Sequence, residues 1–238
     1  VMRGIKPDNI VTRNGDTLEE DWPFFDENDP VNTYNPLYVD AVVSNPPYSQ
    51  AWDPSNKEHD PRYSRFGLAP KGKADYAFLL HDLFHIKPDG IMTIVLPHGV
   101  LFRGGEEGQI RKNLIENNHI DTIIGLPANI FFGTGIPTII IVLKQKRENT
   151  DTLIIDASKG FIKEGKNNKL RASDIKRIVD AVMNRESIDK FSRLVSREEI
   201  RSNDYNLNIP RYVDSSEPAE TWDLYASMFG GIPMTEID

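Results

Sequence analysis

Residues 39–48 decide the fold, and they read Val39-Asp40-Ala41-Val42-Val43-Ser44-Asn45-Pro46-Pro47-Tyr48. The apolar run 39–44 predicts a buried strand. The two prolines that follow fix φ and remove backbone donors, so nearby carbonyls stay free to accept hydrogen bonds from something else. In open α/β sheets, ligands bind at the carboxyl ends of strands. The sequence therefore places an amide, two prolines and an aromatic ring where a ligand is expected.

These side chains suit one kind of ligand, a planar amine on a base. The amide oxygen of Asn45 and the carbonyl of Pro46 can hold an exocyclic amine by both its hydrogens. The ring of Tyr48 can stack on the base that carries the amine. The alternative is a simple turn that ends the strand, since Asn-Pro and Pro-Pro are both typical of turns.

Outward from this stretch, apolar strands alternate with amphipathic helices. The pattern predicts strands at 10–13, 39–44, 91–96, 120–126, 137–144 and 152–156, and helices at 73–86, 106–117 and 173–184. Such alternation predicts an α/β fold with a largely parallel sheet and helices on both faces. The short connection between 120–126 and 137–144 predicts a hairpin, or a swapped antiparallel strand, near one edge.

Composition narrows the class of protein. The chain of 238 residues has a formal net charge of −8 and no cysteine. The charge argues mildly against a free-standing nucleic-acid binder, though not against a catalytic subunit whose partner supplies most phosphate contacts. The lack of cysteine excludes a disulfide framework and cysteine-ligated zinc, and it allows an intracellular location. No stretch approaches the length of a membrane span.

The order of motifs resembles the modification subunit of type I restriction-modification systems, a family of adenine-N6 DNA methyltransferases. The resemblance covers nearly the whole chain. It rests on Gly15-Asp16-Thr17-Leu18, the stretch 45–48, Ala74-Asp75-Tyr76-Ala77-Phe78, Leu96-Pro97-His98-Gly99-Val100-Leu101-Phe102, Phe131-Phe132-Gly133-Thr134-Gly135-Ile136-Pro137-Thr138 and Asn206-Leu207-Asn208-Ile209-Pro210-Arg211-Tyr212. It implies part of a Rossmann-like, S-adenosylmethionine-dependent methyltransferase sheet, with a C-terminal helical extension.

The resemblance also implies roles for the four residues after the first apolar run. Asn45, Pro46, Pro47 and Tyr48 would form the catalytic motif. Within it, Asn45 and the Pro46 carbonyl would accept hydrogen bonds from the target amine, and Tyr48 would stack on the flipped adenine.

Three further residues are implied around that motif. Asp16, taken to follow the first strand, would meet the adenine moiety of S-adenosylmethionine. Phe132 would take the other face of the flipped base, with Phe131 as its rival because spacing does not separate them. The alternative for Asp16 is a turn that caps backbone, and the alternative for both phenylalanines is core packing.

The long segment between 49 and 73 carries basic side chains interleaved with Tyr63 and Phe66. This mixture favours contact with DNA phosphates and displaced bases, while the alternative is a solvated loop. The candidates for DNA contact are Lys57, Arg62, Arg65, Lys71 and Lys73. The partners implied by the family are double-stranded DNA, the specificity and restriction subunits and a second modification subunit, in the cytoplasm and away from membranes.

One family feature is missing from the sequence. The glycine-rich motif that holds S-adenosylmethionine belongs upstream of residue 1, and Gly104-Gly105-x-x-Gly108 lacks its spacing and predicts a flexible loop. We therefore expect a fragment that is inactive in isolation. We expect it to divide into the C-terminal part of the catalytic domain (1–148), an α/β extension (149–214) and a helical tail (215–238).

Two other readings of function stay open. The same four residues suit an amino-methyltransferase that acts on RNA or on a protein glutamine, and the missing cofactor motif also suits a non-catalytic assembly module. A metal site is not expected. The histidines at 81, 85, 98 and 119 lack the spacing of metal ligands, so they predict structural roles.

Overall fold

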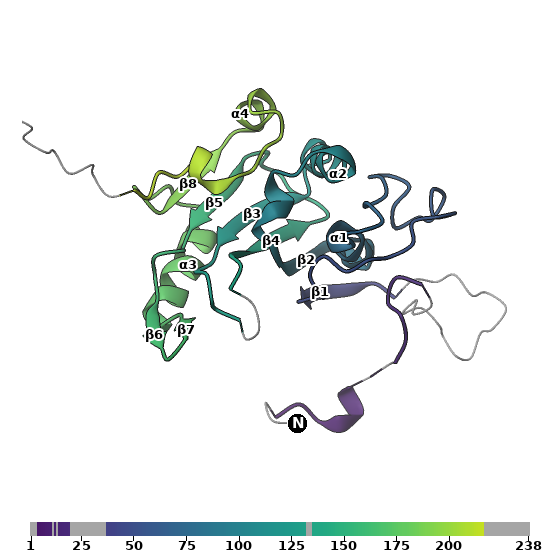
Figure 1. Cartoon of the computed structure of the whole chain (residues 1–238), viewed down its shortest axis with the longest axis horizontal. Coiled ribbons are helices and arrows are strands. Elements are labelled where there is room, and N and C mark those ends of the chain that lie inside the picture. Colours follow the sequence, from purple (N-terminus) through teal and green to yellow (C-terminus); the bar gives the residue numbers. More distant parts are fainter. Residues whose placement is uncertain (1–3, 11, 13, 20–36, 132–134, 217–238) are drawn as a thin grey trace, which may run out of the picture.

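The computed structural model describes residues 4–10, 12, 14–19, 37–131 and 135–216. They form a six-stranded sheet in the order β1-β2-β4-β3-β5-β8, with a separate two-stranded ribbon β6-β7 (Figure 1). The strands are β1 (Val39–Ser44), β2 (Ile86–Pro97), β3 (Ile120–Gly125), β4 (Thr138–Lys144), β5 (Thr152–Asp156), β6 (Ile162–Glu164), β7 (Asn167–Lys169) and β8 (Ser192–Val195). The helices are α1 (Asp75–Phe84), α2 (Gly105–Glu116), α3 (Ala172–Asn184) and α4 (Arg197–Ser202), with 3₁₀ turns η1 (Pro7–Asn9), η2 (His98–Leu101) and η3 (Ile209–Arg211).

The sheet is mixed rather than largely parallel. Strands β1 and β2 pair in parallel, as do β3 and β5, whereas β4 is antiparallel to both its neighbours and β8 is antiparallel to β5. The hairpin between β3 and β4 is confirmed, but its expected place near one edge is wrong. Strand β4 lies between β2 and β3 because its apolar residues pair and pack on both sides.

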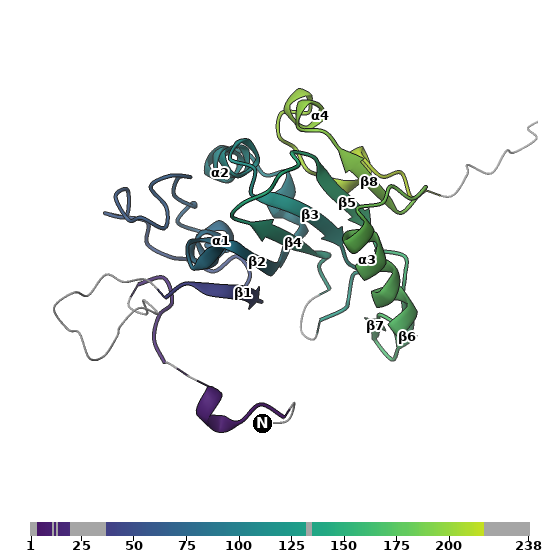
Figure 2. The same cartoon turned by 180° about the vertical axis from the view of Figure 1, so that it is seen from behind.

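Alternating side chains build one core on each face of the sheet. Ile123 and Ile141 belong to the core under α1 and α2, and their neighbours Ile124 and Val142 belong to the core under α3. Helix α3 accordingly lies behind the sheet in Figure 1 and in front of it in Figure 2. The expected α/β class with helices on both faces is confirmed.

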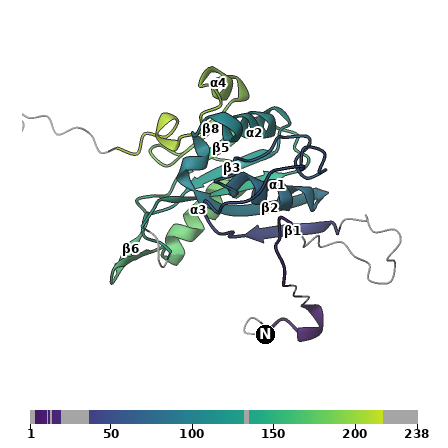
Figure 3. The same cartoon turned by 45° about the vertical axis from the view of Figure 1, so that its right-hand side comes forward.

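Strand β1 is not the buried strand that its sequence predicts. It forms the border of the described sheet (Figure 3), and Val43 is 89% exposed. In β2, Ile91 pairs with Ala41 and is 39% exposed on the same side of the sheet as Val43. Helix α1 covers only the other face of this strand pair, and no described element covers this one. An apolar face is therefore open at the β1 border.

Element ends differ from the prediction in two places. Strand β2 begins at Ile86 rather than at the predicted residue 91, and it includes an irregularity opposite Asp40. There Gly90 is required, because a Cβ would lie 3.0 Å from the carbonyl oxygens of Asp40 and Lys87. No strand occurs at 10 or 12, the described residues of the expected first strand.

The segment from 149 onward continues the same sheet. It adds β5 and β8, and Val195, Ile200 and Leu207 join the core under α1 and α2. The amide of Leu207 donates to the carbonyl of Leu101 over 2.9 Å. Residues 217–238 of the expected tail lie outside the described residues. Within the described ranges, no helix has the length and apolar character to cross a bilayer.

Candidate functional site

Four strands end at one edge of the sheet. Strands β1, β2, β3 and β5 point the same way, because each is parallel to the next or is joined to it through antiparallel β4. Residues 45–48 follow β1, η2 follows β2, and the segment 126–137 follows β3. The amide of His98 donates to the carbonyl of Pro137 over 3.1 Å, which ties the last two together. The carboxyl edge therefore gathers the segments that follow these strands, and the predicted motif at 45–48 is one of them.

At this edge, Asn45 and Tyr48 form a hydrogen-bonded pair. The Tyr48 hydroxyl donates to Oδ1 of Asn45 over 2.8 Å. Asn45 is exposed and Tyr48 is half-buried, and burial raises the pKa of the tyrosine so that it remains a donor at neutral pH. An amide oxygen has two lone pairs, so Oδ1 can still accept a hydrogen bond from a ligand. Pro46 is half-buried and Pro47 exposed.

The backbone after this pair is anchored to helix α1. Ser49 has φ of 51°, which is uncommon for a residue other than glycine. Its amide donates to Oδ1 of Asp75 over 2.7 Å, and the carbonyl of Gln50 accepts from the amide of Ala74 over 2.8 Å. These contacts fix the direction in which the chain leaves residues 45–48.

Asp75 is itself part of a buried charge network. It is fully buried, and Nη1 of Arg103 lies 3.3 Å from its Oδ2. The same nitrogen lies 2.9 Å from Oε1 of Glu107. Burial raises the pKa of Glu107, and Arg103 opposes that rise. Sequence reasoning missed these roles, although an acidic residue in the first turn of the apolar helix 75–84 was the available signal.

The two aromatic candidates differ in position. Phe131 is half-buried and packs against the core under α3, which is the structural alternative considered for it. Phe132 lies outside the described residues. The assignment of Phe132 to the second face of the base therefore stays a prediction.

Asp16 is placed elsewhere. Its Oδ1 accepts from the amide of Leu18 over 3.0 Å, as in a capping turn, and Leu18 is buried. Arg62 holds this turn, donating to the carbonyl of Leu18 over 3.1 Å, and its Nη1 lies 3.1 Å from Nδ1 of His81. His81 lies well along α1 from Asp75, toward the amino end of β1. His85, next to the end of α1, contacts Leu37 and Val39 at the start of β1, so the turn at Asp16 that Arg62 holds lies toward that end rather than beside Asn45.

The basic segment divides into buried and exposed parts. Arg62 is 3% exposed and pairs with Asp60 over 2.7 Å, so its guanidinium faces the interior rather than a ligand. The interleaved aromatics Tyr63 and Phe66 are also core residues. For Arg62, burial corrects the expectation of DNA contact.

The remaining cations of this segment are more accessible. Lys57 pairs with Glu19 over 2.8 Å, and Arg65 donates to the amide oxygen of Asn117. Lys71 is exposed and Lys73 half-buried. DNA contact through Lys57, Arg65, Lys71 and Lys73 stays a prediction.

The buried histidines sit in structural surroundings. The rings of His81 and His85 are tilted with respect to each other, with centroids 4.8 Å apart, and burial lowers the pKa of His81 to about 3. Burial also lowers the pKa of His98 and of His119. In the part of the chain that the structure describes, no three acidic or histidine side chains group closely enough to hold a metal ion.

Comparison with known proteins identifies the family that carries this site. A model of the N-6 DNA methylase family matches residues 1–221. The chain belongs to the N-6 DNA methylase family. The chain is 39% identical over 230 residues to the type I restriction enzyme MpnII methylase subunit of Mycoplasma pneumoniae, and 36% identical over 200 residues to the MjaVII methylase subunit of Methanocaldococcus jannaschii.

Solved structures agree. The methyltransferase subunit of a type I restriction-modification system from Streptococcus thermophilus superposes with a TM-score of 0.83 and 54% identity over 90% of this chain. The EcoKI M protein shares the fold, with a TM-score of 0.58 and 19% identity over 76% of the chain. The resemblance read from the sequence is thereby confirmed.

The chain spans less than half the length of these relatives. The match with the MpnII subunit covers 94% of this chain and 42% of that subunit. The match with the MjaVII subunit covers 78% of this chain and 34% of that subunit. The chain covers 44% of the Streptococcus thermophilus subunit.

Proposed function

We propose that this chain supplies the target-base side of the active site in a type I adenine-N6 DNA methyltransferase. The observation that carries the proposal is the Asn45–Tyr48 pair at the carboxyl edge of the sheet, in a chain that belongs to the N-6 DNA methylase family. An exposed amide oxygen beside an aromatic ring is a site for a planar amine.

The chain's own groups would act on the amine by orienting it. The N6 amine of adenine is a poor nucleophile because its lone pair is delocalised into the ring. When Oδ1 of Asn45 and the carbonyl of Pro46 accept its two hydrogens, a pyramidal nitrogen with a directed lone pair is favoured. Positioning and preorganised acceptors then supply most of the catalysis.

The target adenine must leave the duplex to reach these acceptors. Extrusion costs a few kcal/mol, which stacking on an aromatic ring offsets. Tyr48 would provide one stacking surface, because its ring is held half-buried beside Asn45. Phe132 would provide the other.

The methyl donor expected for this family is S-adenosylmethionine, which supplies an electrophilic methyl group on a sulfonium centre. Asp16 is the residue assigned to it by resemblance. That residue does not fit the role in its described position, because it caps a turn toward the amino end of β1.

The family resemblance also suggests partners. We infer that the substrate is double-stranded DNA and that the chain acts in the cytoplasm, in a complex with specificity and restriction subunits and a second methylase subunit. One related structure concerns the assembly of a type I restriction-modification complex, and it resembles this chain in fold.

Asn45→Ala tests the proposal in a full-length methylase subunit that carries this sequence, assembled with its specificity subunit. We expect methylation of DNA adenine to be abolished while the complex still forms. Asn184→Ala, at the exposed end of α3, is the matched control and should leave turnover unchanged. Near-normal turnover by Asn45→Ala would exclude the proposed site.

Labelled S-adenosylmethionine offered with DNA, RNA or protein then separates the substrate classes. Transfer to DNA adenine is the expected result. Transfer to RNA, or to a glutamine amide, would support the other amino-methyltransferase readings of the same four residues.

A further inference from the structure

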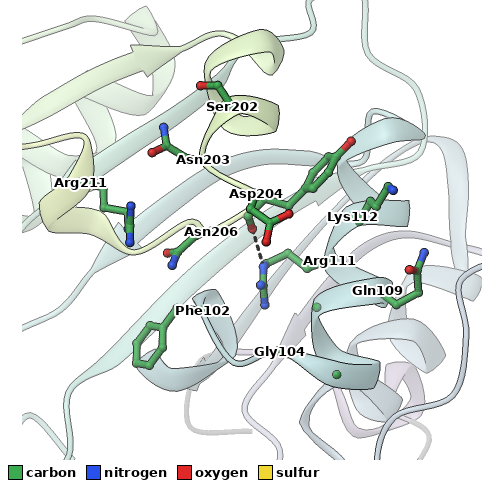
Figure 4. Close-up of a pocket in the computed structure, with 13 residues that line it drawn as sticks. Phe102, Gly104, Gln109, Arg111, Lys112, Ser202, Asn203, Asp204, Asn206 and Arg211 are labelled. Atoms are coloured by element: carbon green, nitrogen blue, oxygen red, sulfur yellow. Dashed lines mark hydrogen bonds between the residues drawn. The ribbon is translucent and has the colours of Figure 1, made fainter.

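A cavity of about 630 Å³ opens between the amino end of α2 and the segment 202–211 (Figure 4). Helix α2 and the turn before it form one wall, and the chain from the end of α4 through η3 forms the other. The cavity lies outside the Asn45–Tyr48 pair, and the function proposed above does not use it.

Three cations and one carboxylate line this cavity. The cations are Arg111, Lys112 and Arg211, and the carboxylate is Asp204. The balance is positive in a chain whose net charge is −8. A local excess of positive charge in an acidic chain points to an anionic ligand.

The two arginines differ in burial and in hydrogen bonding. Arg111 is 3% exposed and is fixed by bonds from Nε to the carbonyl of Tyr205 over 2.6 Å and from Nη1 to the carbonyl of Val100 over 3.0 Å. Arg211 is exposed, and among the described residues its guanidinium has no hydrogen-bonding or ion-pair partner. In Figure 4 the two side chains come from opposite walls with Asn206 between them. One cation is rigid and the other is free to close on a ligand.

The lining also suits more than a bare ion. Phe102 is 44% exposed at the rim, and the amide side chains of Gln109 and Asn206 face the same space. Aromatic, amide and guanidinium groups together are typical of surfaces that track a nucleic-acid strand, where rings stack and cations meet phosphates.

The cavity is joined to the proposed target-base site by short contacts. The amide of Leu207 donates to the carbonyl of Leu101, in the turn that follows β2 at the carboxyl edge. Arg103, next to Gly104 of the cavity wall, pairs with Asp75, which in turn accepts from the amide of Ser49. These contacts connect the cavity wall to the segments that carry the proposed base site.

We propose that the cavity binds a backbone phosphate of the DNA strand near the target adenine, with Arg211 as the principal contact and Lys112 as a second. This proposal rests on the proposed function. The cavity's place at the same edge as the base site favours a phosphodiester over a carboxylate of a partner subunit.

Arg211→Gln tests the site in the full-length subunit assembled with its specificity subunit. The measurement is the anisotropy of a labelled duplex carrying an adenine that the wild-type complex methylates, at several salt concentrations. We expect binding to weaken by roughly tenfold and the salt slope to fall by about one. Lys112→Gln should act in the same direction with a smaller effect, and Arg211→Lys should restore part of the affinity.

Lys176→Gln is the matched control, because it removes the same charge from α3, on the other face of the sheet. In the wild type Lys176 pairs with Asp180 of the same helix. Affinity and slope unchanged in Arg211→Gln would overturn the phosphate site while wild-type methylation still supports the proposed function. A wild-type complex that methylates no duplex would overturn both. Weaker subunit assembly with an unchanged slope for the assembled complex would assign the cavity to a protein partner instead.

Discussion

The hydroxyl of Tyr48 donates a hydrogen bond to the side-chain oxygen of Asn45 over 2.8 Å. In this arrangement Oδ1 of Asn45 faces the hydroxyl, and the bond restrains the side chain that carries the acceptor. It also links two functions that the tetrapeptide motif lists separately, because the group that would stack on the base also aligns the group that would bind the amine.

Tyr48→Phe in a full-length subunit separates these functions. The ring remains for stacking, but the amide loses a partner worth about 1 kcal/mol, so we expect kcat to fall by about fivefold to tenfold with little change in DNA affinity. Tyr48→Ala should lower affinity as well. Single-turnover methylation and DNA binding, measured together, would show the difference. Equal losses of affinity in both variants would contradict the orienting role.

Asp75→Ala should destabilise the fold, because it removes an ion-pair partner of Arg103 and the hydrogen-bond acceptor of the Ser49 amide. Breaking a buried ion pair costs about 3 kcal/mol. Urea unfolding of the full-length subunit would measure the loss. Asp180→Ala, on the exposed face of α3, should change the free energy of unfolding by less than about 0.5 kcal/mol.

Arg62→Ala and Lys71→Ala should behave oppositely. Arg62 is buried against Asp60 and the turn at Leu18, so its loss should lower the free energy of unfolding by about 3 kcal/mol. Lys71 is exposed, so its loss should spare stability and weaken DNA binding. Unfolding and DNA-binding curves for each variant would check this. A stable Arg62→Ala variant with weakened DNA binding would restore Arg62 as a DNA contact.

Gly125→Ala tests how η3 is seated on the sheet. A Cβ at Gly125 would lie 2.6 Å from Cδ1 of Ile209, which is the far end of a flexible side chain. We expect a cost of about 1 kcal/mol in thermal or urea unfolding. Ile209→Val removes the crowding methyl group, so the double variant should be more stable than the sum of the single changes predicts. Strict additivity would show that the two residues do not meet.

Stability should fall as pH is lowered from 7 to 5. His81 has a pKa of about 3 in the fold, caused by burial and then by His85 and Arg62, against an ordinary value near 6.5. Its stabilising effect is therefore complete above pH 6.5 and is lost as pH falls, by about 2 kcal/mol at pH 5. Asp82, with a pKa raised by burial to about 6, acts in the opposite direction over part of this range.

His81→Gln isolates the histidine, because Asp82 is common to both proteins. Urea unfolding at a series of pH values should give a shallower dependence for the variant. The same slope in both proteins would mean that His81 titrates normally in the fold.

Much of the architecture could be predicted from the sequence because buried strands consist of consecutive apolar residues. The strands at 120–126, 137–144 and 152–156 were found within a residue or two. The partner of each strand could not be found in this way. A run such as Thr138–Lys144 is equally apolar whether its neighbours are parallel or antiparallel, so the central place of β4 emerged only from the pairing.

The site was predictable to the extent that it is contiguous in sequence. Asn45 and Tyr48 are close in the chain and meet in the fold. The sequence predicts Asp16 beside them because it predicts a strand before Asp16, but the described residues 10 and 12 form no strand and the turn at Asp16 lies elsewhere. Arg62 looked like a surface cation because burial of a charge depends on distant partners, here His81 and the carbonyl of Leu18.

The outer edge and the exposed face of β1 have a practical consequence for the preparation of this polypeptide. Among the described residues no strand pairs with the outer edge of β1, and a strand in that position offers backbone groups for pairing. Here it also presents the exposed side chain of Val43. Two molecules that pair through their β1 edges can form backbone hydrogen bonds there and cover Val43. Purification of the 238-residue chain by itself should therefore select for self-associated material. Soluble yield should depend on whatever is co-produced to occupy that border.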